Sequence, residues 1–253
     1  MKSRLGVNVD HIATLRNARG EGHPDPISYA RQVMNFGANS ITIHLREDRR
    51  HIRDEDVAIF SKIKRVPINL EMAANNEMLK IALKYKPNFV CIVPEKRNEI
   101  TTEGGLNITK NKKIIKKVIS KLNSKKIRTS LFINPNIKDV FASKELNAKC
   151  VELHTGKFAL KVKNNKNYLV EFKKIKNCAT LAKKLGMEVH AGHGLDYKST
   201  KILRKIKSIE EFNIGHFIIG EAIMYGMKKV ITNFRKILNL SLIHISEPTR
   251  HRG

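Results

Sequence analysis

The chain has 253 residues, of which 49 are lysine or arginine and 23 are aspartate or glutamate, and its formal net charge at pH 7 is +26. This length is enough to bury a sizeable core without help from disulfides or metal ions. No apolar stretch is long enough to cross a bilayer, and no signal peptide precedes the first predicted strand, so we expect a cytoplasmic protein with no membrane partner. The cysteines Cys91, Cys150 and Cys178 have neither disulfide nor metal-type spacing, which fits a reducing compartment.

Eight short apolar runs recur along the chain at about the spacing of one strand plus one helix. We expect each run to form a β-strand. In chain order the predicted strands cover residues 5–9, 40–44, 67–71, 89–93, 128–133, 150–154, 187–190 and 212–219. Polar residues that can do chemistry end or follow every one of these runs.

Between the runs, the apolar residues follow the period of an amphipathic helix. The helices predicted in this way cover residues 27–36, 54–64, 76–85, 113–122, 138–146, 169–185, 197–206 and 228–238. Strands that alternate with helices are typical of parallel βαβ units, so the pattern predicts an α/β fold, a single-domain (β/α)8 TIM barrel over residues 1–239. Residues 240–253 begin with a sequence that resembles a translated sequencing adapter, and we expect them to be a non-native tail.

The carboxyl ends of all strands in such a barrel meet on one face, where active sites are built. Asn8, Asp10 and His11 lie around the end of the first predicted strand, and we expect Arg16 and Arg19 to follow on a loop. Asn and Asp can orient hydroxyl groups or an amine, while Arg offers a planar fork for phosphate oxygens. The structural alternative is an Asp-His pair that only caps a turn.

The second predicted strand ends in His44 and is followed by a basic loop that contains Arg46, Arg49, Arg50 and His51. This loop either holds an anion or is simply solvated. Glu71 closes the next strand, so His44 and Glu71 are expected on neighbouring strand ends. Such a pair can divide the duties of acid and base, with pKa values tuned by burial.

Glycines mark the ends of the last two predicted strands, in AGHGL (residues 191–195) and NIGHFIIG (residues 213–220). Backbone amides there can form a nest for an anion, and barrel enzymes frequently bind phosphate at this place. Two tight turns are the structural alternative. His193 lies beside the predicted nest and can donate or accept a proton. We expect the long segment 95–114, with the glycines of residues 101–105, to be a lid.

Eight motifs together resemble the pyridoxine 5'-phosphate synthase family, in the same order and at similar intervals. They are GVNVDHIATLRNARG, HLREDRRHI, NLEMA, VPEKR, TTEGGL, ELHTG, AGHGL and NIGHFIIG. The resemblance extends from Leu5 to about Leu238. It implies a ring closure between 1-deoxy-D-xylulose 5-phosphate and 3-amino-2-oxopropyl phosphate, without a cofactor or a metal ion, that gives pyridoxine 5'-phosphate, phosphate and water.

The resemblance also implies a role for each residue that matches a family motif. His44 and Glu71 correspond to proton acceptors and His193 to a proton donor. The pentulose phosphate would contact Asp10, His11, Arg46, His51 and Thr101. The amino ketone phosphate would contact Asn8, Arg19, Gly194, Gly215 and His216. The family forms octamers in which the arginine that matches Arg19 crosses a subunit contact. His190 stands where the family more often has Asn, and we expect it to add an imidazole near the pocket.

Two other functions remain open. A different phosphate-binding barrel, an isomerase or a lyase with Lys96 as Schiff-base amine, is the enzymatic alternative. The basic composition favours a nucleic-acid binder in the other class. The lysines are spread along predicted helix faces, however, as in residues 110–117 and 121–126, and the chain has no Trp to stack on bases. We therefore expect solvated lysines and no nucleic-acid partner.

Overall fold

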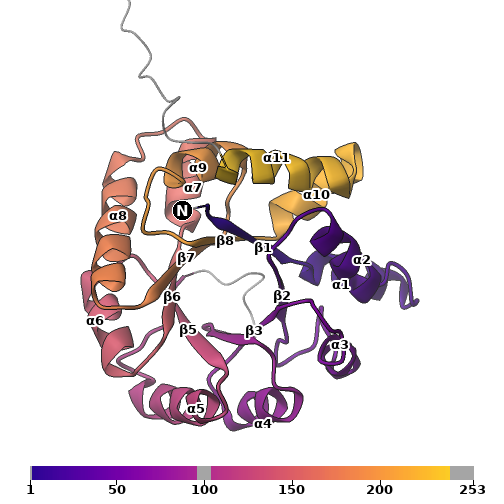
Figure 1. Cartoon of the computed structure of the whole chain (residues 1–253), viewed down its shortest axis with the longest axis horizontal. Helices are drawn as coiled ribbons and strands as arrows, with labels where there is room; N and C mark the ends of the chain where they lie inside the picture. The colour runs from indigo at the N-terminus through magenta and orange to yellow at the C-terminus, as the bar shows by residue number, and fades with distance from the viewer. Residues whose placement is uncertain (1, 96–103, 240–253) are drawn as a thin grey trace, which may run out of the picture.

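The protein folds as a barrel of eight parallel strands surrounded by helices (Figure 1), in a computed structural model that describes residues 2–95 and 104–239. The strands pair in sequence order, and β1 closes the barrel against β8. They are β1 Arg4–Asn8, β2 Ser40–His44, β3 Ile68–Met72, β4 Phe89–Ile92, β5 Arg128–Ile133, β6 Cys150–His154, β7 Glu188–Gly192 and β8 Glu211–Ile214. The predicted TIM barrel is confirmed. The predicted tail lies outside the described residues.

The described residues also form the helices α1 Asp10–Arg19, α2 Pro26–Asn35, α3 Asp54–Phe60, α4 Asn76–Tyr85, α5 Lys112–Ser124, α6 Ile137–Glu145, α7 Gly156–Lys163, α8 Leu169–Lys184, α9 Tyr197–Leu203, α10 His216–Tyr225 and α11 Met227–Asn239. Side-chain caps explain several of their starts. Asp25 accepts hydrogen bonds from the backbone of Ile27 and Ser28, and Asp196 forms a capping box with Ser199. Every predicted helix is present, with ends that differ by a few residues.

Three helices were not predicted, and two expectations about them were wrong. Arg16 and Arg19 lie on α1, not on a loop, because the helix begins directly after β1 and its polar sequence hides the helical period. The predicted strand 212–219 ends at Ile214, and the apolar residues after Gly215 belong to α10. A short apolar run fits a buried strand and a buried helix equally well, so periodicity alone could not separate them.

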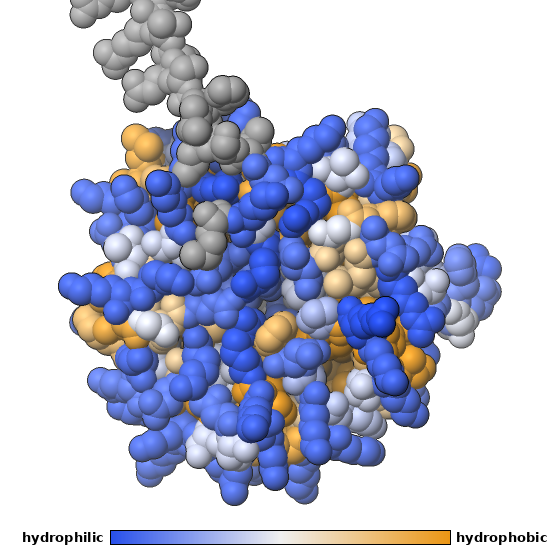
Figure 2. Space-filling model, in the orientation of Figure 1, coloured by the Kyte–Doolittle hydropathy of each residue, from blue (hydrophilic) through white to orange (hydrophobic). Residues whose placement is uncertain are grey.

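The hydrophobic core lies between the barrel and its helices. Apolar strand residues such as Leu5, Val7, Ile41 and Ile43 are fully buried in one cluster with apolar helix residues such as Phe234. Successive strand residues point to opposite sides, so these side chains face outward and their neighbours face into the barrel. Figure 2 shows one end of the barrel, where hydrophilic residues dominate and the apolar patches are small. No described helix is both long and apolar enough to span a membrane.

The inside of the barrel is polar, whereas the interior of a TIM barrel is usually filled by branched apolar side chains. Contacts between strands that are not neighbours establish this. The Cys91 thiol of β4 lies 4.0 Å from Glu152 of β6, and Glu152 accepts a 2.6 Å hydrogen bond from Asn213 of β8. A Cβ atom at Gly192 would collide with the Glu152 carboxylate, so a glycine makes room for this buried acid.

The amino end of the barrel is closed by a network of ion pairs. Arg4 pairs with Glu188 and Glu211, and Arg128 also pairs with Glu188. The His190 ring joins the network, with Nε2 3.1 Å from Glu188 and Nδ1 3.8 Å from Glu211. The expectation that His190 lies near the pocket is therefore wrong, because its place on β7 aligns it with Glu211 at the start of β8.

Candidate active site

Asp10, His44 and Glu71 meet at the carboxyl end of the barrel. His44 and Glu71 are direct neighbours in the pairing of β2 with β3, and His44 Nδ1 lies 3.8 Å from Glu71 Oε2. Asp10, in the first turn of α1, accepts a 2.8 Å hydrogen bond from the His44 backbone and a 2.7 Å bond from the Asn8 amide. The predicted acid/base pair is thus side by side, with Asp10 as a neighbour.

Glu71 is the most perturbed acid of this cluster. Burial raises the pKa of Glu71 well above its ordinary value, and the nearby carboxyl groups of Glu152 and Asp10 raise it further. Removal of a carboxylate from water disfavours its charged form, and a second negative charge has the same effect. Glu71 therefore binds a proton more tightly than an ordinary glutamate does.

Glu152 is a site residue that the sequence prediction missed. Burial raises the pKa of Glu152 to about 7, against the opposing effects of His190 and of the hydrogen bond from Asn213. This acid lies below Glu71 in the barrel and acts on its pKa. A charged residue in the middle of the buried strand CVELH was the signal that could have revealed it.

Asp10, His44 and Glu71 also bring ligand atoms within 4.8 Å of one another, a spacing that a metal ion could bridge. Metal ligands must be deprotonated and must have free lone pairs. The raised pKa of Glu71 favours its uncharged form, which is a poor metal ligand. The donor set therefore suits proton transfer better than a resident cation.

A second group at the mouth consists of imidazoles. His11 lies between His51 and His216, with ring centroids 5.8 and 5.1 Å away. His51 Nδ1 is 2.8 Å from the Thr14 hydroxyl. Burial lowers the pKa of His11 and of His51, so both rings are neutral at neutral pH and can donate or accept hydrogen bonds. His11 and His51, predicted to contact the pentulose phosphate, therefore lie next to His216, predicted to contact the amino ketone phosphate.

Arg46 and Glu95 line the other side of His44. Arg46 is buried, with Nε 3.6 Å from Glu95, and the other Glu95 oxygen lies 3.8 Å from His44 Nε2. Burial alone would raise the pKa of Glu95, but interactions with His44 and the Glu47 backbone outweigh it and lower that pKa. Glu95, absent from the predicted binding set, thus supplies a charged carboxylate beside two predicted site residues.

Three arginines that we expected to hold anions have carboxylate partners. Arg16 forms a buried two-bond pair with Asp56, at 2.6 and 2.8 Å. Arg49 pairs with Asp54 and Glu77, and Arg50 pairs with Asp48. Of the basic loop, Arg46 and His51 lie beside the His44 cluster, although Arg46 also has Glu95 as a carboxylate neighbour.

The glycine motifs predicted to form an anion nest lie at the ends of β7 and β8. His193 and Gly194 both adopt the left-handed conformation, with φ values of 79° and 76°. A Cβ at Gly215 would lie only 2.8 Å from Cβ of Asn8, so Gly215 lets the two strand ends approach closely. Burial lowers the pKa of His193. Asn8, Gly215 and the adjacent His216 therefore lie together, as expected for one binding group.

Arg19 does not join this group within the same chain. Its side chain is 79% exposed and lies 3.6 Å from Glu21 on the surface. It follows Asp10 by nine helical residues, a distance of about 13 Å along the axis of α1. Thr101, Lys96 and part of the predicted lid lie outside the described residues.

Comparisons with known proteins agree with this geometry. The sequence profile described as "Pyridoxal phosphate biosynthesis protein PdxJ" matches residues 5–240. A pyridoxine 5'-phosphate synthase from Pelagibacter ubique is 63% identical over 236 residues, which cover 93% of this chain and 99% of the relative. The enzyme of that name from Zymomonas mobilis is 50% identical and is matched over 93% of this chain and 91% of its own length.

Solved structures with little sequence similarity share the fold alone. The 3-keto-L-gulonate-6-phosphate decarboxylase of Vibrio cholerae aligns with a TM-score of 0.64 at 13% identity, over 94% of this chain and 98% of that one. The tryptophan synthase A-subunit of Pyrococcus furiosus aligns with a TM-score of 0.59 at 14% identity, over 95% and 100%. The extent of the family match and the identity to its members show that this chain belongs to the pyridoxal phosphate biosynthesis protein PdxJ family.

Proposed function

We propose that this chain is a pyridoxine 5'-phosphate synthase that joins 1-deoxy-D-xylulose 5-phosphate to 3-amino-2-oxopropyl phosphate and closes the pyridine ring. The observation that carries the proposal is the Asp10, His44 and Glu71 cluster at the barrel mouth, in a chain 63% identical to a synthase of that name. Products are pyridoxine 5'-phosphate, inorganic phosphate and water. Neither a cofactor nor a metal ion takes part in the proposed reaction.

The reaction requires repeated proton transfers. The amine first condenses with the ketone of the pentulose to form an imine. Imine formation releases one water molecule, and enamine formation, loss of the pentulose phosphate, addition of water, ring closure and loss of two further water molecules follow. We assign His44 and Glu71 as proton acceptors and His193 as the proton donor. The raised pKa of Glu71 supports this role, because a carboxylate with a raised pKa is a stronger base than an ordinary glutamate. Glu152 would keep that pKa high.

The two phosphorylated substrates would bind to separate parts of the mouth. We assign the pentulose phosphate to Asp10, His11, Arg46, His51 and Thr101, and the amino ketone phosphate to Asn8, Arg19, Gly194, Gly215 and His216. The buried Arg46 supports the first group, since a guanidinium suits phosphate oxygens. The close approach of Asn8 to Gly215, followed by His216 at the start of α10, supports the second.

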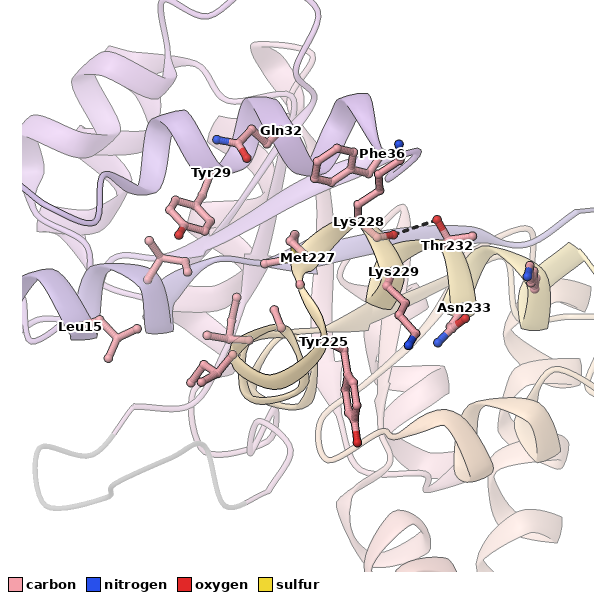
Figure 3. A pocket seen from close by; sticks show the side chains of 16 residues that line it. Leu15, Tyr29, Gln32, Phe36, Tyr225, Met227, Lys228, Lys229, Thr232 and Asn233 are labelled. Carbon is pink, nitrogen blue, oxygen red and sulfur yellow. Dashed lines mark hydrogen bonds between the residues drawn. The ribbon is translucent and has the colours of Figure 1, made fainter.

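Self-association, in a homo-octamer, would complete the site. Arg19 is exposed on α1, and a groove of about 840 Å³ lies between α1, α2, α10 and α11 (Figure 3). Leu15, Ile223 and Tyr225 line this groove and are 46%, 72% and 55% exposed. Apolar side chains exposed together often mark an interface. A second subunit docked there would bring its own Arg19 to the neighbouring mouth.

We place the protein in the cytoplasm, where reducing conditions suit its three cysteines, which are all free and buried. We also retain the proposal that residues 240–253 are a non-native tail. The proposed function needs no contact with nucleic acid or with a membrane.

The test is to mix the purified protein, shortened after Asn239, with both phosphorylated substrates and to detect pyridoxine 5'-phosphate by absorbance and mass. We expect product from the parent protein and at least about 100-fold slower product formation by the Glu71→Gln variant. A folded protein without product would return the function to the other phosphate-binding barrels. Loss of turnover in Lys96→Met would favour a lyase, because its Schiff base would need the Lys96 amine.

A complementation assay tests the subunit contribution of Arg19. Arg19→Ala and Glu71→Gln variants should each be inactive alone. When the two are unfolded, mixed and refolded together, some mixed sites combine an intact Glu71 with an intact Arg19 from the partner, so activity should return. No recovery from correctly assembled mixed particles would mean that Arg19 does not act across subunits.

A further inference from the structure

His193 has a backbone conformation that residues other than glycine seldom adopt. Its φ of 79° lies in the left-handed region, directly after the last residue of β7, and Gly194 follows with φ 76°. A side chain with a Cβ atom is disfavoured in this region. Neighbouring structure must therefore hold His193 in place.

Thr155, at the end of β6, makes the contacts that do this. Its hydroxyl oxygen lies 2.8 Å from the Gly192 carbonyl oxygen and 2.7 Å from that of His193. The backbone N–H of Thr155 donates a 2.9 Å bond to the same Gly192 carbonyl. Because Thr155 is fully buried, no water competes for its single hydroxyl proton, which the two carbonyls share.

The residues on either side of Thr155 pack against the His193 ring. His154 lies with its ring centroid 4.8 Å from that of His193, at an interplanar angle of 31°, and Phe132 supports it from behind at 5.3 Å. Gly156 leaves room for both imidazoles, because a Cβ there would lie 2.9 Å from His154 Cε1 and 3.0 Å from His193 Cδ2. Thr155 thus holds the His193 backbone, His154 packs against the His193 ring, and Gly156 leaves space for that ring.

We propose that Thr155 is a positioning residue for His193, and that His154 and Gly156 form the wall against which the imidazole is aligned. The inference rests on the proposed function, since His193 is the assigned proton donor. Thr155 would act without touching substrate, because its hydroxyl is committed to two backbone carbonyls. Its effect is to fix the donor nitrogen relative to the reacting atoms, where a displacement of about 1 Å can lower a rate on the order of 100-fold.

The test compares two substitutions of Thr155 with a matched control. Thr155→Val removes the hydroxyl and keeps the shape, so kcat should fall about 10- to 100-fold while KM for both substrates stays nearly unchanged. Thr155→Ser keeps the hydroxyl and should restore most of kcat. The control is Thr200→Val, because Thr200 is also fully buried but its hydroxyl has no hydrogen-bond partner among the described residues. Its kcat should match that of the parent protein.

Full activity of Thr155→Val in an active parent background would overturn the proposal, as would equal losses in the valine and serine variants. A crystal structure of Thr155→Val provides a readout independent of turnover and so separates this proposal from the proposed function. We expect the His193 carbonyl to move and φ to leave the left-handed region, and an unmoved loop would overturn the positioning role.

If Thr155→Val does not fold, the Gly156→Ala variant is tested instead. Gly156 lies in the helix α7, and its backbone conformation is one that alanine also adopts. Its methyl group would push against both imidazoles. A lower kcat at an unchanged melting temperature supports the proposal, and an unchanged kcat contradicts it.

Discussion

The two ends of the barrel bury charged and titratable groups in opposite ways. At the amino end Arg4 and Arg128 face Glu188 and Glu211, so each charge has a partner of opposite sign. At the carboxyl end Glu71 lies near the acids Glu152 and Asp10, and burial together with their charges raises the pKa of Glu71 well above its ordinary value. Paired charges hold the strands together, whereas crowded acids are poised to exchange protons. The comparison separates a structural end from a reactive end within one polar interior.

Glu71→Gln should have the largest effect and should act on catalysis alone. The amide keeps the shape of the side chain but cannot transfer a proton, so kcat should fall about 100- to 10,000-fold. Since Glu71 lies near other acids, the melting temperature of the Glu71→Gln variant should remain the same as that of the parent protein or rise. Steady-state kinetics and calorimetry check both results. A large loss of stability would show that the carboxyl end is structural as well.

Arg128→Met should give the opposite result at the amino end. The change removes the ion pair with Glu188 and the stacking of the guanidinium on Phe89, 3.9 Å from the ring centroid. We expect unfolding free energy to fall by about 2 to 3 kcal/mol, near the lower limit for a buried pair because both side chains are about one-fifth exposed. Urea denaturation measures this loss. A matching drop in kcat of the folded protein would contradict the division between the two ends.

His154→Gln should reduce the acid sensitivity of the fold. Burial, with contributions from His193 and Lys157, lowers the pKa of His154 to about 4 from the ordinary value of 6.5. Between these values the unfolded chain binds a proton that the folded protein does not, so stability falls as pH falls through this window. From pH 7.5 to pH 5 the His154 contribution is about 2 kcal/mol. Urea denaturation at both pH values should show a smaller loss in the variant, and identical losses would contradict the assignment.

His190→Asn should have the smallest effect. Burial works to lower the pKa of His190, but Cys150 and Glu211 raise it overall, so the folded protein favours the charged ring. This contribution is present below pH 6.5 and is lost as pH rises through the folded pKa. We expect the free energy of unfolding of the variant to be lower by on the order of 1 kcal/mol at pH 6 and by less at pH 8. Its activity should equal that of the parent protein. A changed pH profile of kcat would place His190 with the reactive end instead.

The strand ends could be predicted from the sequence because parallel topology brings them to one face. That rule alone put His44 beside Glu71, and the structure brings these two side chains together. The rule does not reveal which strand residues meet across the barrel. Glu152 therefore escaped prediction, although its partner Asn213 stands in a predicted strand.

Arginine roles could not be predicted from position. Arg16 and Arg46 both follow strand ends in basic sequence, yet Arg16 is buried against Asp56 while Arg46 lies beside Glu95 at the mouth. The choice depends on which carboxylate the fold brings within reach, and Asp56 lies 40 residues further along the chain.

The sequence by itself determined the eight alternating units, and with them the face on which the chemistry lies. The hydrophobic period and the order of the units along the chain are both properties of the local sequence. Tertiary structure alone decided the polar barrel interior, the ion network at its amino end and the contacts of Thr155 with the His193 backbone. Each of these is a pairing between residues far apart in the chain. Their energies depend on distance and burial, which exist only after the barrel has closed.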